Sequence, residues 1–455
     1  MPRKGHLMKR IILVLVVMSL LITLTGPSAA LGQDQSRIGQ TWPQWRGPLG
    51  TGEAPHADPP DQWSETQHIR WKVEIPGNAQ ATPLVWGDQV FVSTAISVGA
   101  SNVNDGLFTR LTRRFTRTEG AIETLRYVVL ALDRRNGRVI WEQVVREEVP
   151  HEGKHQTGSW ASSSAVTDGE VLCAFFGSRG LYCFTMTGQP LWDHDFGDMD
   201  IRMGFGEGAS PALYGNTIVV NWDHQGQSFI TALDKRTGHT LWRSARDEIT
   251  SWATPLVVEH NGRAQVVTSA TNRVRSYDLE TGVLLWDGEG VTLNAIPSPV
   301  AADGVVYLTS GFRGNQLYAV ALDDADGDVT GSNAIVWSLD QDTPYVPSPL
   351  LYGGILYLTK GNNGILSAYD ARTGQLHYGP ERLPGIRSLY ASPVAAATRV
   401  YIPSRDGITL VVAAGPSFEV LSTNVLDDRF DSSPAIVDGE IYLRGHRYLY
   451  CIADD

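Results

Sequence analysis

Cysteine is scarce in this chain, and basic residues are outnumbered by acidic ones. The 455 residues include three cysteines, Cys173, Cys183 and Cys451, an odd and small number that does not suit a disulfide framework. No two cysteines are adjacent, and no Cys-x-x-Cys-His sequence for haem attachment occurs. The 37 Lys and Arg residues stand against 49 Asp and Glu residues, for a net charge of −12. We therefore expect no nucleic-acid partner, because nucleic-acid binding needs a basic surface.

Long hydrophobic runs are missing as well, apart from one near the N-terminus. Residues 11–24 form a mostly apolar run of 14 residues, short of the roughly 20 that a membrane-spanning helix needs. Basic residues precede this run and small residues follow it. We therefore expect a signal peptide over residues 1–32, cleaved after Ala30 or Gly32, with an uncleaved anchor as the alternative. No cysteine lies near the cleavage region to carry a lipid, so we expect a periplasmic or secreted protein without a transmembrane span after cleavage.

Cys173 and Cys183 flank a Gly-Ser-Arg-Gly turn, which predicts that they lie on paired strands. A two-residue loop would pair Ala174 with Cys183 and place the two cysteines on opposite faces of the sheet. A three-residue loop would set them opposite each other. We expect buried free thiols rather than a crosslink, because free cysteine usually behaves as a small apolar residue.

The chain contains an internal repeat with two conserved-looking elements. The first is an Asp-x-x-Thr-Gly turn that leads into a strand ending near Trp, with full copies at Asp133–Trp141, Asp234–Trp242, Asp278–Trp286 and Asp370–Tyr378, a shortened copy at Met186–Trp192, and an expanded turn before Trp337. The second is a Ser-Pro element, found at Ala81–Pro83, Ala209–Pro211, Ala253–Pro255, Pro297–Pro299, Pro347–Pro349, Ala391–Pro393 and Ser432–Pro434, with a copy lacking Pro at Ser162–Ser164. These copies make eight units.

Each unit spans roughly 40–50 residues and holds about four short apolar runs, which is typical of a propeller blade. In the turn, Asp caps backbone N–H groups and Gly takes the positive φ that closes the hairpin. We expect the Trp side chain to pack on the neighbouring blade. The sequence therefore predicts an all-β fold, an eight-bladed β-propeller of four-stranded antiparallel blades.

The two ends of the repeat region complement each other. The last unit, Ser432–Asp455, holds three strands and stops before its Trp strand, whereas His68–Ile75 is a Trp strand without the other three. Pairing them would remove two open sheet edges. We therefore expect the N-terminal strand to close the ring, with a signal peptide at 1–32, an N-terminal extension at 33–67 and the propeller at 68–455.

These repeats resemble the pyrroloquinoline-quinone (PQQ) type, which also builds quinoprotein alcohol dehydrogenases and the BamB-type outer-membrane assembly propeller. Trp42–Pro48 followed by the propeller is similar to exported propellers of Planctomycete-type bacteria. The resemblance implies the fold, and it makes PQQ a possible cofactor. In the dehydrogenases, PQQ lies above a disulfide between adjacent cysteines with calcium or a lanthanide beside it, and BamB is usually a lipoprotein; this sequence lacks both cysteine features.

Candidate site residues precede the Ser-Pro elements, where we expect them to rim the central channel. They are Gln80, Trp160, Glu207, Trp252, Tyr345, Tyr390 and Asp431, with His155, Arg202, Arg387 and Arg429 a few positions upstream. Such a mixture suits a sugar, a peptide or a quinone, although every propeller has a channel rim. The candidates for contact with a cofactor are Trp160, Glu207, Trp252, Tyr390 and Asp431.

Two other segments could bind a ligand. Asp323–Asp328 resembles a calcium loop, but its spacing departs from that of an EF-hand, so we interpret it as an acidic hairpin tip and expect no metal. The insertion at 97–126 is locally basic and suits either an anionic partner or plain solvent exposure. No catalytic motif is evident. The leading hypothesis is an exported, non-catalytic scaffold that binds a protein or glycan partner through one face; the alternatives are a PQQ-dependent oxidoreductase and a BamB-type assembly factor.

Overall fold

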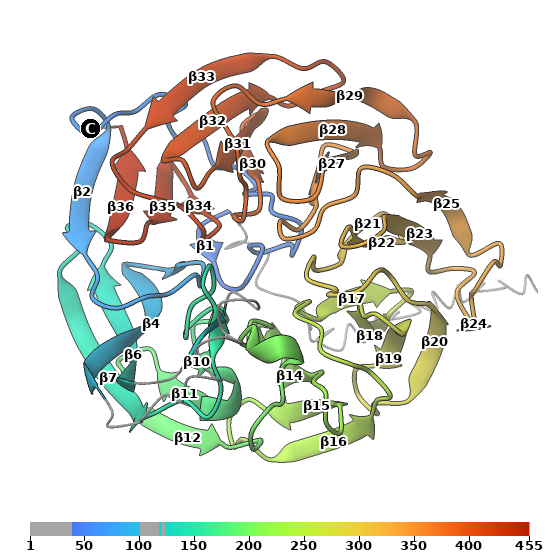
Figure 1. The fold of residues 1–455 in the computed structure, drawn as a ribbon, viewed down its shortest axis with the longest axis horizontal. Coiled ribbons are helices and arrows are strands. Elements are labelled where there is room, and N and C mark those ends of the chain that lie inside the picture. The colour runs from blue at the N-terminus through green and yellow to red at the C-terminus, as the bar shows by residue number, and fades with distance from the viewer. Residues whose placement is uncertain (1–38, 101–117, 121–122, 455) are drawn as a thin grey trace, which may run out of the picture. The chain divides into compact units, whose positions relative to one another are not determined.

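The computed structural model describes residues 39–100, 118–120 and 123–454, and it confirms the eight-bladed propeller (Figure 1). Each blade is a four-stranded antiparallel sheet that runs from the channel outward. The predicted signal peptide, and most of the basic insertion, lie outside the described residues. Within the described part of the chain, no helix is long and apolar enough to span a membrane.

The strands follow one another blade by blade. Blades 1 to 3 consist of β3 (Leu84–Trp86), β4 (Gln89–Ala100), β6 (Glu123–Asp133) and β7 (Val139–Glu148); β9 (Val166–Thr167), β10 (Val171–Phe175), β11 (Leu181–Thr185) and β12 (Pro190–His194); and β13 (Ala212–Tyr214), β14 (Thr217–Trp222), β15 (Phe229–Asp234) and β16 (Thr240–Ala245). Blades 4 to 6 consist of β17 (Leu256–His260), β18 (Arg263–Thr268), β19 (Arg273–Asp278) and β20 (Leu284–Glu289); β21 (Val300–Ala302), β22 (Val305–Ser310), β23 (Gln316–Ala321) and β25 (Ile335–Leu339); and β26 (Leu350–Tyr352), β27 (Ile355–Thr359), β28 (Ile365–Asp370) and β29 (Leu376–Arg382).

Blades 7 and 8 complete the ring. They consist of β30 (Val394–Ala396), β31 (Arg399–Pro403), β32 (Ile408–Ala413) and β33 (Val420–Val425); and β34 (Ala435–Val437), β35 (Glu440–Arg444), β36 (Tyr448–Ala453) and the N-terminal strand β2 (Ile69–Glu74). The short elements are β1 (Thr41–Trp42) on blade 1, β24 (Gly327–Asp328) on blade 4, the pair β5 (Thr118–Glu119) and β8 (Lys154–His155), and two 3₁₀ turns, η2 (Gly177–Arg179) and η3 (Arg202–Gly204).

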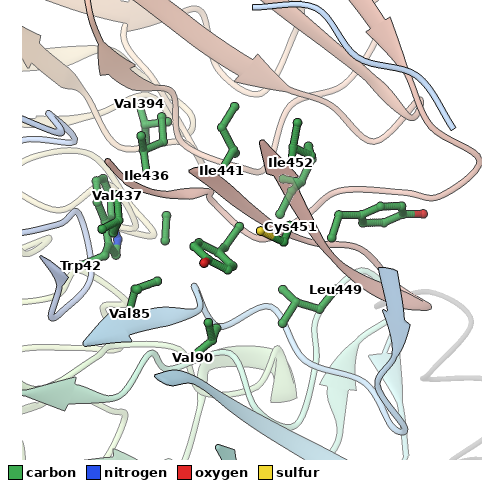
Figure 2. Packing of buried hydrophobic residues seen from close by; sticks show 14 of the residues in the cluster. Trp42, Val85, Val90, Val394, Ile436, Val437, Ile441, Leu449, Cys451 and Ile452 are labelled. Atoms are coloured by element: carbon green, nitrogen blue, oxygen red, sulfur yellow. The ribbon is translucent and has the colours of Figure 1, made fainter. Parts of the chain in front are cut away.

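The ring is closed as the sequence predicts. Strand β2 pairs antiparallel with β36, so that Trp71 lies opposite Cys451 and Val73 opposite Leu449. The hydrophobic cluster behind this seam joins blades 7, 8 and 1, and it includes Trp42 from the segment before the propeller (Figure 2).

The repeated turn connects five of the eight blades to the blade before it. In blade 3, Asp234 Oδ1 accepts hydrogen bonds from the N–H groups of Arg236 and Thr237, at 3.0 and 2.9 Å. Gly238 has a φ of 71°, and a Cβ atom there would lie 2.6 Å from the Trp192 ring of blade 2. The Trp192 Nε1–H group donates to the carbonyl oxygen of Lys235 at 2.9 Å. In the same way, a Trp ring of one blade lies against the turn glycine of the next blade in four other pairs: Trp71 with Gly137, Trp141 with Gly188, Trp242 with Gly282 and Trp337 with Gly374.

The Gly238→Ala variant should therefore lose more stability than the cost of placing alanine in a left-handed backbone conformation. We expect a decrease of about 2–4 kcal/mol in the free energy of unfolding, from the left-handed backbone and the collision with Trp192. Gly262→Ala is the matched control, since Gly262 has a φ of 75° and an added Cβ would meet no atom within 4 Å. The control should cost about 1 kcal/mol. Equal losses in chemical denaturation would contradict the stacking role.

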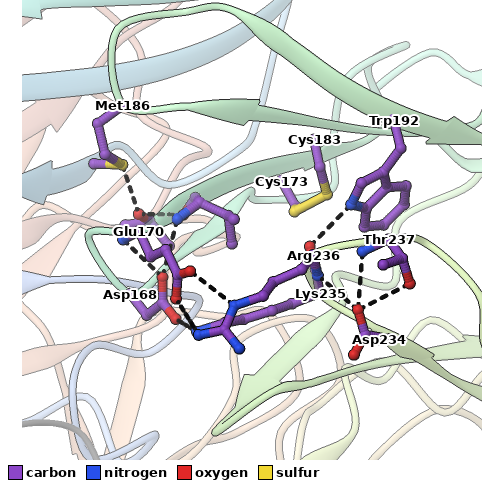
Figure 3. The surroundings of a disulfide bond; sticks show 12 residues. Asp168, Glu170, Cys173, Cys183, Met186, Trp192, Asp234, Lys235, Arg236 and Thr237 are labelled. Atoms are coloured by element: carbon purple, nitrogen blue, oxygen red, sulfur yellow. Dashed lines mark hydrogen bonds and ion pairs between the residues drawn. A yellow bond between two sulfur atoms is a disulfide. The ribbon is translucent and has the colours of Figure 1, made fainter.

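The expectation of free thiols at Cys173 and Cys183 is wrong, because these residues form a disulfide (Figure 3). The turn between β10 and β11 is the three-residue η2, closed by a hydrogen bond from Phe176 N–H to the Gly180 oxygen at 2.9 Å. This loop length sets Cys173 directly opposite Cys183. Cys451 is a free, buried cysteine.

A series of hydrogen bonds to hydroxyl groups runs around the channel. It shows that the repeated element of blade 2 begins one residue later than the sequence predicted. The backbone N–H of one Ser or Thr donates to the side-chain hydroxyl of the equivalent residue in the next blade, at distances of 2.9–3.1 Å. In chain order, these residues are Thr82, Ser164, Ser210, Thr254, Ser298, Ser348, Ser392 and Ser433. The blade 2 element is therefore Ser163–Ala165 and not Ser162–Ser164. At the seam between blades 8 and 1, Ser432 Oγ donates instead to the Ala81 oxygen at 2.7 Å.

Candidate functional site in the central channel

Residues 41–58, which we call the plug, run inside the ring along the innermost strands (Figure 1). Trp42 pairs with Val85 of β3, and the plug exchanges further backbone hydrogen bonds of 2.8–3.2 Å with blades 2, 6, 7 and 8, namely Thr167 N–H to the Pro43 oxygen, Leu351 N–H to Thr51, Ala395 N–H to Gly52, and Asp58 N–H to Asp438. The guanidinium of Arg46 is buried and donates from Nη2 to the Pro349 oxygen at 2.8 Å. The plug thus crosses the channel and links most of the blades.

A cavity of about 470 Å³, which we call the cup, occupies the channel where the innermost strands begin. All eight blades contribute to its lining through Gln80, Ser162, Glu207, Trp252, Ile296, Tyr345, Tyr390 and Asp431, in chain order. Trp45 of the plug also lines the cup, and its Nε1–H group donates to Ser298 Oγ at 3.0 Å. Because the plug pairs with the strands beyond these residues, it lies across the inner end of the cup.

The structure brings most of the predicted site residues together. Gln80, Glu207, Trp252, Tyr345, Tyr390, Asp431 and the upstream His155 all line the cup. Trp160 instead lines a smaller pocket of about 30 Å³ that adjoins the cup at Glu207, because the blade 2 element begins one residue later than the sequence suggested. Among the upstream arginines, Arg202 begins the turn η3, Arg387 pairs with Asp406 at 2.7 Å, and Arg429 approaches Asp431 from outside the lining at 3.3 Å.

Sequence analysis missed several lining residues. Trp45 belongs to the plug, and Thr157, Phe205, Phe312 and Asn362 lie on loops between strands. Only Trp45 had a signal, since it lies in the Trp42–Pro48 segment that resembles exported propellers. The loop residues occupy no repeated position, so nothing in the repeat pattern indicates them.

The aromatic side chains of the cup are held in place by their neighbours. Phe312 and Tyr345 stack with centroids 4.7 Å apart and an interplanar angle of 22°. The Nε1–H group of Trp252 donates to the Gly206 oxygen at 2.7 Å. The guanidinium of Arg405 lies 3.9 Å from the centroid of the Tyr390 ring.

Asp431 is the centre of a charged cluster at the wall of the cup. Its carboxylate pairs with Arg405 at 2.6 Å and with His446 Nε2 at 2.9 Å, and only 1% of the side chain is exposed. Gln80 Nε2 donates to the Thr157 oxygen at 2.5 Å and lies 3.4 Å from Asp431 Oδ2. With Arg405 and Arg429 as cationic neighbours, the negative charge of Asp431 is already compensated by the protein.

Glu207 is anchored by the η2 turn of blade 2. Its Oε2 atom accepts from Ser178 N–H at 2.7 Å, and its Oε1 atom accepts from the Ser178 hydroxyl. Burial raises the pKa of Glu207. Only glycine fits at position 177, since a Cβ there would overlap Glu207 Oε2. In the small pocket beside it, burial raises the pKa of Glu152 to about 7.

The two other predicted ligand sites behave differently. In the acidic turn, Asp323 pairs with His260 at 2.7 Å and Asp328 with Arg273 at 3.0 Å. Among the described residues, no three His, Cys, Asp or Glu side chains converge as a metal site requires. The arginines of the insertion between 101 and 117 lie outside the described residues, so their role stays a hypothesis.

Comparison with known proteins places the fold in a family. The profile of the family described as outer membrane protein assembly factor BamB, which is built of PQQ-like repeats, matches residues 62–194, 125–289, 179–335 and 226–452. The chain therefore belongs to this family of PQQ-like repeat β-propellers. No curated protein sequence matches it.

Solved structures of BamB and of two dehydrogenases are similar to this chain. BamB from Moraxella catarrhalis is 15% identical with a TM-score of 0.55, over 84% of this chain and 98% of BamB. Quinohemoprotein alcohol dehydrogenase from Comamonas testosteroni is 11% identical with a TM-score of 0.60, over 91% and 80% of the two chains. A europium-containing methanol dehydrogenase is 10% identical with a TM-score of 0.60, over 90% of each chain. At these identities the similarity establishes the fold alone.

Proposed function

We propose that this protein is an exported, non-catalytic ligand-binding propeller whose site is the cup. The observation that carries this proposal is a channel crossed at its inner end by the plug and lined by all eight blades. Its volume lies within the range of about 300–1,000 Å³ typical of small-ligand pockets. A signal peptide at residues 1–32 would direct export, and its removal would leave the extension and the propeller as the mature protein.

The state of the two carboxylates supports binding rather than catalysis. A general base must present a carboxylate oxygen within hydrogen-bond reach of the substrate. Asp431 is paired with Arg405 and His446, and both oxygens of Glu207 accept hydrogen bonds from Ser178. Each carboxylate therefore holds neighbouring side chains of the cup wall in place.

PQQ, which the dehydrogenase relatives make possible, does not fit this lining. PQQ is a planar quinone with three carboxylate groups, so a pocket that holds it should supply cationic partners. Among the described residues that line the cup, none is Lys or Arg. The disulfide of this chain joins β10 to β11 and is buried in the hydrophobic core of blade 2, away from the cup lining.

An assembly factor that binds a protein partner is the second candidate. The family description and the similarity to BamB favour it, because both name a protein of outer-membrane assembly. Such a partner would contact a face of the propeller. The affinity of this propeller for its protein partner should then be unchanged by substitutions inside the cup.

We expect the purified protein to oxidise neither primary alcohols nor aldoses when it is supplied with PQQ and calcium. A dye-linked assay measures this, with an authentic quinoprotein alcohol dehydrogenase as the positive control. The reason is the mismatch between the tricarboxylate cofactor and a cup whose described lining residues include no Lys or Arg. Turnover that disappears in Glu207→Gln or Asp431→Asn would overturn the proposal and establish the oxidoreductase alternative.

A further inference from the structure

The wall of the cup has two chemically different halves. Blades 4 to 7 contribute the apolar and aromatic side chains of Trp252, Ile296, Phe312, Tyr345, Val346 and Tyr390, beside the smaller polar ones of Thr254, Ser298, Ser348 and Asn362. Blades 8 and 1 to 3 contribute mainly polar side chains, namely Asp431, Gln80, Thr157, Ser162 and Glu207, beside the aromatic ring of Phe205. A ligand that fills the cup meets flat rings on one side and hydrogen-bonding groups on the other.

The polar half is fixed in place before any ligand binds. Thr157 Oγ1 lies 2.7 Å from His155 Nδ1 and donates to the hydroxyl of Tyr390 at 3.3 Å. The Thr157 carbonyl oxygen accepts from Gln80 Nε2, and the same nitrogen faces Asp431. Both contacts use the nitrogen of Gln80, which leaves its Oε1 atom to accept a hydrogen bond from a ligand. Preorganised groups of this kind bind hydroxyls at a low entropic cost.

The charges around the cup favour a neutral ligand. An anion would find no Lys or Arg among the described lining residues and would face the carboxyl group of Glu207. A cation would gain little from Asp431, whose charge is already compensated by Arg405 and Arg429. The guanidinium of Arg405 against Tyr390 would also repel it, since that ring already interacts with a cation.

Taking the cup as the binding site proposed above, we propose that its ligand is the end of a neutral glycan chain. Pyranose rings present an apolar C–H face, which stacks on aromatic rings, and a rim of hydroxyls, which bonds to polar groups, and the two halves of the cup match these two surfaces. Because the plug lies across the inner end with Trp45 in the lining, a chain enters end-on and does not thread through the ring.

The test is isothermal titration calorimetry of the full mature protein with a defined panel of ligands. The neutral probes are cellotriose, maltotriose, xylotriose and N-acetylchitotriose, and the comparison probes are trigalacturonate, choline and trialanine. We expect at least one neutral trisaccharide to bind, and none of the three comparison probes. Tyr345→Ala should weaken that binding at least tenfold. The matched control is Tyr214→Ala, which removes another half-buried tyrosine, on β13, that does not line the cup.

Trp252→Ala provides a second variant in case Tyr345→Ala fails to fold. Circular dichroism shows whether each variant is folded. If no neutral trisaccharide binds, the glycan proposal is overturned. If choline, trigalacturonate or trialanine binds and Tyr345→Ala abolishes this, the cup is a binding site but the ligand class is wrong. If a trisaccharide binds and neither cup variant weakens it, both the glycan inference and the cup as the functional site are overturned.

Discussion

Replacement of strand β2, Ile69–Glu74, by six glycine and serine residues is expected to abolish soluble, folded protein. The strand completes blade 8, and without it β36 would present an open edge beside a large hydrophobic cluster. Trp71 alone is 7% exposed and packs on Tyr442 with ring centroids 5.8 Å apart. Loss of a buried Trp side chain costs about 3–5 kcal/mol, so we expect the whole strand to cost more than about 5 kcal/mol.

The replacement keeps the chain length, so the plug stays connected to the propeller. Its control is the same glycine-serine replacement at residues 323–328, a largely exposed segment that includes only the two-residue strand β24 at the outer edge of blade 4. The control should remain soluble and melt close to the unmodified protein. Thermal unfolding monitored by circular dichroism compares the two. A β2 replacement that melted like its control would show that ring closure does not depend on this strand.

Arg246→Met is expected to lower the free energy of unfolding by about 3–5 kcal/mol, because it leaves a buried carboxylate unpaired. Arg246 and Asp223 have fully buried side chains and form a bidentate ion pair, with Nε–Oδ1 and Nη2–Oδ2 distances of 2.7 and 3.0 Å. Arg246 Nη1 also donates to Thr268 and Tyr277, at 3.0 and 2.9 Å. Asp223 directly follows β14 and Arg246 directly follows β16 in blade 3, whereas Thr268 lies on β18 and Tyr277 on β19 of blade 4. The network therefore connects blades 3 and 4.

The double variant Asp223→Leu with Arg246→Met separates the pair from the buried charge. We expect it to be more stable than Arg246→Met alone, because no unpaired ion remains in the core. Arg126→Met is the surface control, since Arg126 and Glu147 pair at 3.1 Å with 41% and 47% of their side chains exposed. It should change stability by no more than about 1 kcal/mol. If Arg246→Met lowered the free energy of unfolding by no more than this control does, solvent would have to reach Asp223.

The blade architecture could be predicted from the sequence because its determinants are local and repeated. The Asp-x-x-Thr-Gly turn forms within five residues, as the contacts of Asp234 with Thr237 illustrate, and the same turn recurs in most blades. The contact between Trp192 and Gly238 follows from the order of the blades along the chain. Ring closure through Trp71 was evident for the same reason, since the missing strand of one end is the extra strand of the other.

The candidate site depended on features that the repeat does not encode. One residue of register in blade 2 moves Trp160 out of the cup, and the three-residue η2 turn sets Cys173 opposite Cys183. Both depend on local loop geometry, because the turn type and the loop length fix the register of a hairpin.

The sequence by itself determined the number of blades, the turn that joins them and the strand that closes the ring, because each belongs to a pattern that repeats along the chain. Only the tertiary structure decided that residues 41–58 lie across the channel, that Trp45 lines the cup, and that aromatic side chains gather on one half of its wall. The physical reason is that these residues lie up to several hundred positions apart. Curvature of the ring, set by the packing of all eight blades, brings them to one axis.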